Sequence, residues 1–175
     1  WSALARRRAW WVALGVLLAA PAIRFGRTNL WLATGRSFAW IDVAIDSDSR
    51  RAALHVRRWT RPGEKIFVWG FRPEIYYYSQ RLGATRFLES QPLTGVPADR
   101  HLERWEPLLP HRRAELLQQL WTTPPAVIVD GLGPYNPRLR MENYPELRAV
   151  LEWYRLEATT AGTRIYVQPP AGSGG

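Results

Sequence analysis

The sequence contains no cysteine, which excludes disulfide bonds, zinc-finger sites, iron–sulfur clusters and thiol nucleophiles together. It has one lysine, Lys65, among 24 basic residues, so arginine carries almost all of the positive charge. With 15 acidic residues, the formal net charge is +9. A genome-wide coding bias would explain the arginine excess, and recognition of phosphate or lipid head groups is the alternative explanation.

The 175 residues suffice for one domain of ordinary size and an appendage. A content of 46% hydrophobic and 13% aromatic residues excludes disordered, collagen-like and low-complexity chains. The first residue is Trp1 rather than Met, so we expect the chain to begin inside a longer protein. Residues 169–175 are rich in Pro, Gly and Ser and are expected to form a flexible tail.

Residues 9–23 (AWWVALGVLLAAPAI) carry no charge and are flanked on both sides by arginines. As a helix they would extend about 22 Å, against a hydrocarbon core of roughly 30 Å. Trp10 and Trp11 stand where an interfacial aromatic belt would place them. We therefore expect residues 1–35 to hold a transmembrane helix and a connector, followed by a soluble domain over residues 36–168.

Two alternatives for this apolar segment stay open. A cleavable signal peptide has a basic start, an apolar stretch and a small-residue site, and residues 20–22 supply an Ala-x-Ala pattern. A buried core helix or a helix at the membrane interface is the other alternative, although the segment is apolar on all sides rather than on one stripe. A span or a signal peptide would place the soluble domain outside the cytoplasm when the first arginines stay inside.

Helix and strand patterns alternate through the soluble part. The cluster at residues 46–49 has the composition of a helix N-cap. Such alternation predicts a layered α/β domain with a partly parallel sheet and an antiparallel edge hairpin. The expected helices are 50–59, 75–81, 112–121 and 145–151, the expected strands are 66–69, 85–88 and 126–129, the hairpin pairs 153–157 with 164–168, and a loop with one helical turn covers 89–110.

The candidate binding residues follow two of the expected strands. In open α/β sheets the ligand crevice lies beyond the carboxyl ends of the strands. Arg72 and Glu74 follow one strand, and Asp130 ends another, so neighbouring strands would place Arg72 and Asp130 on one rim. Either these two residues fix the loop as an ion pair or as a cap, or Arg72 contacts a phosphate in front of the following helix.

No catalytic motif is found. The histidines lack metal-ligand spacing, no nucleophile motif surrounds a serine, and no carboxylate pair is marked out. The arginine pairs are scattered among acidic residues, and the motifs of nucleic-acid-binding modules are absent. We therefore expect no metal site, no cofactor and no nucleic-acid partner.

Several segments together resemble the carboxyl-terminal part of bacterial lipid-linked-sugar glycosyltransferases of the GT-C type, classed with glycosyltransferase family 39. These multi-pass membrane enzymes include the protein O-mannosyltransferases and the aminoarabinose transferase of lipid A. The resemblance covers most of the chain as a pattern of strands and turns. It is carried by residues 24–30 (RFGRTNL), 57–70 (RRWTRPGEKIFVWG), 73–81 (PEIYYYSQR), 84–87 (ATRF), 124–130 (PPAVIVD), 154–156 (YRL) and 165–167 (IYV).

The resemblance implies an inner-membrane enzyme that moves a sugar from a polyprenyl-phosphate carrier to an extracytoplasmic acceptor. Its catalytic acidic residue would lie in an early loop outside this sequence, and this chain would be the last membrane helix with a non-catalytic soluble cap. Its partners would be membrane lipid, the carrier-linked sugar and the preceding transmembrane helices. Acceptor or head-group contacts would come from Arg72, Glu74, Arg86 and Asp130.

A different class of function also fits these patterns. The chain would then be a membrane-tethered or secreted α/β binding module, with a basic face for anionic lipid or another phosphate-bearing ligand.

Overall fold

The computed structural model describes residues 3–35, 41–94, 110–133 and 136–169. The chain forms two compact units, Trp1–Ile45 and Asp46–Gly175. The expected loop at 89–110 lies largely outside the described residues, and so does the tail beyond Pro169.

The first unit contains helix α1 (Ala3–Ala33), which includes Pro21. The apolar helix expected from the sequence is therefore confirmed, and it is longer at both ends than the uncharged run. Its stretch Arg7–Gly26 is long and apolar enough to cross a membrane, and none of it is buried. The side chains of Trp10 and Val12, for example, are 76% and 67% exposed. By length and composition this helix fits a membrane span, and a signal sequence near the N-terminus meets the same criteria.

Helix α2 (Ile41–Trp59) begins earlier than its expected cap. Residues 46–49 lie inside the helix, so their prediction as an N-cap is wrong. Asp46 accepts a hydrogen bond from Arg50 one turn further on, at 2.9 Å, which is a favourable spacing on a helix. The Ser49 hydroxyl donates to Glu74, which belongs to another helix. The polar side chains at 46–49 therefore make side-chain contacts rather than cap the helix.

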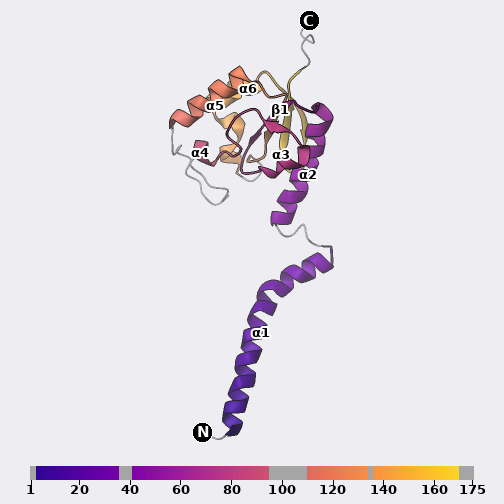
Figure 1. Cartoon of the computed structure of the whole chain (residues 1–175), viewed down its shortest axis with the longest axis vertical. Helices are drawn as coiled ribbons and strands as arrows, with labels where there is room; N and C mark the ends of the chain where they lie inside the picture. Colours follow the sequence, from indigo (N-terminus) through magenta and orange to yellow (C-terminus); the bar gives the residue numbers. More distant parts are fainter. Residues whose placement is uncertain (1–2, 36–40, 95–109, 134–135, 170–175) are drawn as a thin grey trace. The chain divides into compact units, whose positions relative to one another are not determined.

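The second unit has a five-stranded sheet in the order β2-β1-β3-β5-β4. Strand β1 pairs in parallel with β2 and β3, while β5 pairs antiparallel with β3 and β4. The expectation of a partly parallel sheet with an antiparallel edge hairpin is confirmed (Figure 1). The strands are β1 (Lys65–Trp69), β2 (Leu82–Gly83), β3 (Val127–Asp130), β4 (Arg155–Thr159) and β5 (Arg164–Val167).

The prediction of a strand at 85–88 is wrong. The short strand β2 precedes these residues, and after β2 the Ala84 N–H donates a hydrogen bond to the Ile66 carbonyl of β1 at 2.8 Å. The chain then turns, because the Thr85 hydroxyl bonds within its own loop and Phe87 enters the core. The β-branched and aromatic residues at 85–88 led to the prediction of a strand, but the same residue types also suit a partly buried loop.

The helices lie on both faces of the sheet, with α2 and α3 on one side and α5 and α6 on the other (Figure 1). Helix α3 ends at Gln80, which adopts a φ of 55°, close to the end expected for the helix at 75–81. The remaining elements are α3 (Glu74–Ser79), α4 (Gln91–Thr94), α5 (Pro110–Thr122), α6 (Pro145–Leu151) and the 3-10 turns η2 (Pro137–Leu139) and η3 (Met141–Asn143).

Alternation along the strands divides the core into two clusters. Phe67 and Trp69 of β1 face α5 and α6, while Ile66 and Val68 face α2 and α3. Both faces of the central strands are therefore buried, as continuous apolar runs predict for parallel strands. Such a sheet holds the loops at its two edges in fixed positions, and those edges contain the candidate sites.

Candidate functional site

The carboxyl ends of β1 and β3 lie side by side, because Trp69 pairs in register with Asp130. Strand β1 has β2, the next strand in the sequence, on one side and β3 on the other. The sheet edge at the carboxyl ends of β1 and β3 is therefore a topological switch point. Gly70 has a φ of 132°, and a Cβ there would lie 3.0 Å from the Leu132 nitrogen. The two loops therefore pack tightly against each other at the place where such folds usually bind ligands.

Arg72 lies at this edge, in the loop that follows β1, and its side chain is buried, with 3% of its surface exposed. Its Nε donates to the Ser49 hydroxyl at 2.8 Å, and its Nη1 donates to the Thr163 hydroxyl at 2.9 Å. The aliphatic part of the side chain covers Gly131, where an added Cβ would come within 3.1 Å of the Arg72 Cγ. Arg72 thus connects α2, β1 and the β4–β5 hairpin from inside the domain.

Two carboxylates neutralise Arg72. Its Nη2 lies 3.3 Å from the Asp48 carboxylate, which is fully buried, and its Nε lies 3.3 Å from Glu74. Burial by itself would raise the pKa of Asp48, but hydrogen bonds from neighbouring hydroxyls such as Thr163 and the charge of Arg72 hold that pKa below its usual value. The group is a satisfied ion-pair network that joins separate elements.

Asp130 is also buried, at 1% exposure. Its Oδ1 accepts from the backbone N–H groups of Leu132 and Gly133, and its Oδ2 accepts from that of Met141 at 3.1 Å. Burial raises the pKa of Asp130, and these backbone hydrogen bonds act in the opposite direction. The side chain therefore organises the loop that follows β3.

The four predicted site residues do not form one cluster. Arg72 and Glu74 are joined directly, and Asp130 lies at the end of the neighbouring strand. Arg86 is exposed and pairs with Glu115 of α5 at 2.6 Å. The expected ion pair between Arg72 and Asp130 is wrong: among the described ion pairs, Arg72 contacts Asp48 and Glu74 instead. Asp130 accepts backbone N–H groups of the loop that follows β3, which is the capping role that the sequence left open.

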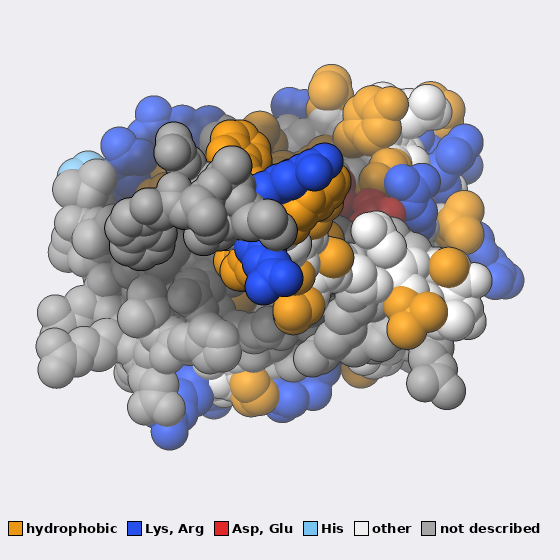
Figure 2. All heavy atoms as spheres, turned by 90° about the horizontal axis from the view of Figure 1, so that it is seen from below, with side chains coloured by type: hydrophobic (Ala, Val, Ile, Leu, Met, Phe, Trp, Pro, Cys, Tyr) orange, Lys and Arg blue, Asp and Glu red, His pale blue; other side chains and the backbone are white. Residues whose placement is uncertain are grey.

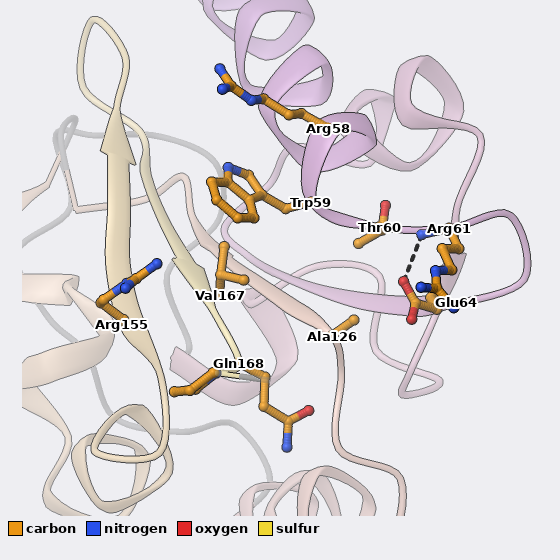
Figure 3. Close-up of a pocket in the computed structure, with 10 residues that line it drawn as sticks. Arg58, Trp59, Thr60, Arg61, Glu64, Ala126, Arg155, Val167 and Gln168 are labelled. Atoms are coloured by element: carbon orange, nitrogen blue, oxygen red, sulfur yellow. Dashed lines mark hydrogen bonds between the residues drawn. The ribbon is translucent and has the colours of Figure 1, made fainter. Parts of the chain in front are cut away.

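A second candidate site lies at the opposite edge of the sheet, at the end of α2. It is an open groove of about 670 Å³. Trp59 reaches over it from α2, Arg155 approaches from β4, and Gln168 follows β5 (Figure 3). Sequence reasoning missed this groove, although the succession of Arg58, Trp59 and Arg61 at a helix end was its visible signal.

The groove is predominantly basic. Neither Arg58 nor Arg61 has an ion-pair partner among the residues that the structure describes. Glu64 also lines the groove, and its carboxylate accepts the backbone N–H of Arg61 at 2.6 Å. Figure 2 shows a different face of the molecule, seen from below, on which basic side chains also lie between hydrophobic ones.

A smaller apolar cavity of about 140 Å³ lies beside the groove, and Gln168 borders both. Its walls include Trp121 and Trp153, whose exposed fractions are 50% and 66%. In the described part of the chain, no group of three or more His, Asp or Glu side chains could hold a metal ion.

Comparison with known proteins gives no family for this chain. No family model, no curated protein and no solved structure matches it.

Proposed function

We propose that this chain is the carboxyl-terminal part of an inner-membrane glycosyltransferase that transfers a sugar from a polyprenyl phosphate to an extracytoplasmic acceptor. Helix α1 would be its last transmembrane span, and the α/β domain would be a cap outside the bilayer. The observation that carries the proposal is the apolar stretch Arg7–Gly26, long enough to cross a membrane, in the same chain as an α/β domain with a five-stranded sheet. The resemblance of the sequence to such enzymes supplies the reaction.

The geometry of the switch-point edge favours a structural role for the cap over a chemical one. Arg72 and Asp130 are buried and engaged by protein groups, so an acceptor would meet the loops that they hold in place. A carboxylate acting as general base needs access to the acceptor hydroxyl. In the proposed enzyme, that carboxylate belongs to the membrane-embedded part that precedes this chain.

The test is to read the gene upstream of the Trp1 codon and to express its full product. We expect further apolar segments of about 20 residues, and sugar transfer from a labelled polyprenyl-phosphate donor by purified membranes. Substitution of each acidic residue in the first extracytoplasmic loop should identify one whose loss abolishes transfer. A start codon within a few residues of Trp1, with no further apolar segment, contradicts the proposal.

A second candidate function is a tethered or secreted binding module for anionic ligands. The observation that favours it is the pair of arginines, Arg58 and Arg61, without carboxylate partners in the described part of the chain. Ligand binding by a chain whose gene encodes no further membrane segments would support this candidate over the transferase.

A further inference from the structure

The groove at the end of α2 combines positive charge with an aromatic face. Arg58 and Trp59 extend from the last turn of α2, and Arg155 approaches from the neighbouring edge strand (Figure 3). Arg61 lies on the turn that leads from α2 to β1. Three separate elements therefore place guanidinium groups around one hollow.

The charges of these arginines are only partly compensated. Arg155 pairs with Glu157 at 2.7 Å, and the guanidinium is largely exposed, so this pair is weak and open to exchange. Glu64 is the one carboxylate among the described residues of the wall, and its hydrogen bond goes to the backbone of Arg61. Since Arg58 has no carboxylate partner in the described structure, an anion can bind here without breaking a strong ion pair.

The aromatic and amide groups of the groove suit a saccharide. Trp59 is 36% exposed, and the buried side chain of Val167 lies below it. The Arg58 guanidinium lies over the Trp59 ring, with its Cζ 5.9 Å from the ring centroid, and the exposed part of the indole beside it offers an apolar surface and a polar N–H to a sugar ring. The Gln168 amide can both donate to and accept from hydroxyl groups. A hollow of about 670 Å³ lies within the range of small-molecule sites.

We propose that this groove binds a phosphorylated saccharide. The arginines contact the phosphate through charge-assisted hydrogen bonds, and the sugar ring lies against Trp59. The site is separate from the switch-point edge, where the sequence had placed the anion contact. Its existence does not depend on glycosyl transfer, because either candidate function leaves the groove unchanged.

The experiment titrates the full chain in a neutral detergent with glucose 1-phosphate, glucose and inorganic phosphate, and isothermal titration calorimetry measures each affinity. Glucose 1-phosphate should bind about tenfold more tightly than glucose or phosphate alone, because only it engages both the arginines and the indole. Binding should weaken with salt, as expected for an exposed charge contact. Equal affinity for glucose and glucose 1-phosphate overturns the proposal.

Variants assign the contacts. Arg58→Gln and Arg61→Gln should each weaken glucose 1-phosphate binding about fivefold, the range of an exposed charge pair. Arg57→Gln is the matched control, since Arg57 is an exposed neighbour on α2 that does not line the groove. Trp59→Leu should reduce affinity for glucose 1-phosphate and leave that for phosphate unchanged. Thermal melting of each variant establishes that the fold is intact.

Two outcomes would refute this assignment. If the Arg58→Gln, Arg61→Gln double variant binds glucose 1-phosphate like the parent, the groove is not the site. If soluble short-chain phosphatidylglycerol binds more tightly than glucose 1-phosphate and loses affinity in the same variants, the ligand is a lipid head group and the saccharide is wrong.

Discussion

The guanidinium of Arg72 and the carboxylate of Asp48 form a buried ion pair, with 3.3 Å between Nη2 and Oδ2. The two residues are 24 positions apart in the sequence: Asp48 lies in α2, and Arg72 lies in the loop between β1 and α3. Thr163 contacts both partners, donating to Asp48 and accepting from Arg72. This arrangement makes the switch-point edge a rigid support, and the stability of the domain should depend on it.

Arg72→Met should destabilise the domain by about 3 to 5 kcal/mol, because Asp48 is left as a buried charge without its partner. Urea unfolding of the full chain in detergent, followed by tryptophan fluorescence, measures the change in the free energy of unfolding. Arg86→Met is the control, since its pair with Glu115 is exposed and should contribute less than about 1 kcal/mol. Equal effects of the two substitutions would show that the Arg72 network does not stabilise the fold.

The stability of the domain should fall in acid through Asp48. The folded pKa of Asp48 lies below its ordinary value of 3.8, because hydrogen bonds and the Arg72 charge outweigh the effect of burial. The ionised group therefore contributes stability that is fully present above pH 3.8 and is lost as the pH falls through the folded pKa. Asp46, whose pKa is lowered by hydrogen bonds from Tyr78 and Arg50, contributes with the same sign.

The measurement is the free energy of unfolding between pH 6 and the acid limit of solubility, for the parent and for Asp48→Asn. The parent should lose stability more steeply than the variant below about pH 4. Parallel curves would contradict the assignment of this acid sensitivity to Asp48.

Asp130→Asn should destabilise the domain at neutral pH by about 1 to 3 kcal/mol. Both carboxylate oxygens accept backbone hydrogen bonds, and an amide would place its NH₂ group opposite the N–H of Leu132 and Gly133 or that of Met141. Burial raises the pKa of Asp130 in the folded state. The titration of Asp130 therefore lowers the free energy of unfolding of the domain as the pH rises from 3.8 through the folded pKa. The difference between parent and variant should therefore be larger near pH 4 than at pH 7, and thermal melting at both values tests it.

Trp69→Asp should unfold the α/β domain. Trp69 is fully buried, packs edge-on against Tyr144 at 5.3 Å, and donates its indole N–H to the Leu139 carbonyl at 2.8 Å. An unpaired charge at this position is too costly to retain. Trp153→Asp is the control, because Trp153 is 66% exposed. Circular dichroism and melting of Trp69→Asp that match the parent would contradict the placement of β1.

Much of the fold could be predicted because strong periodic signals agree with the tertiary structure. The apolar run at 66–69 and the helix at 112–121 are confirmed within one or two residues, and so is the closing hairpin. The start of α2 was not predictable from its residues alone. The Asp and Ser side chains at 46–49 have the composition of a cap, and only contacts with distant residues such as Glu74 show their actual use.

The candidate site was less predictable for the same reason. A rim at the ends of β1 and β3 was expected, and the register confirms that these ends are neighbours. The burial of Arg72 depends on Asp48 and Thr163, and nothing local in the sequence pairs those residues. The groove beside Trp59 is built from three elements whose proximity exists only in the folded domain.

The most direct test of the central claim, a membrane-spanning α1 with the α/β domain outside the cytoplasm, uses the absence of cysteine. Gln118 is exposed on α5, so Gln118→Cys in the full chain introduces a single reactive thiol. In intact bacterial spheroplasts, a membrane-impermeant maleimide should label this thiol, and the labelled chain should stay in the membrane fraction after an alkaline wash. Labelling only after lysis, or release of the labelled chain from the membrane, would contradict the account.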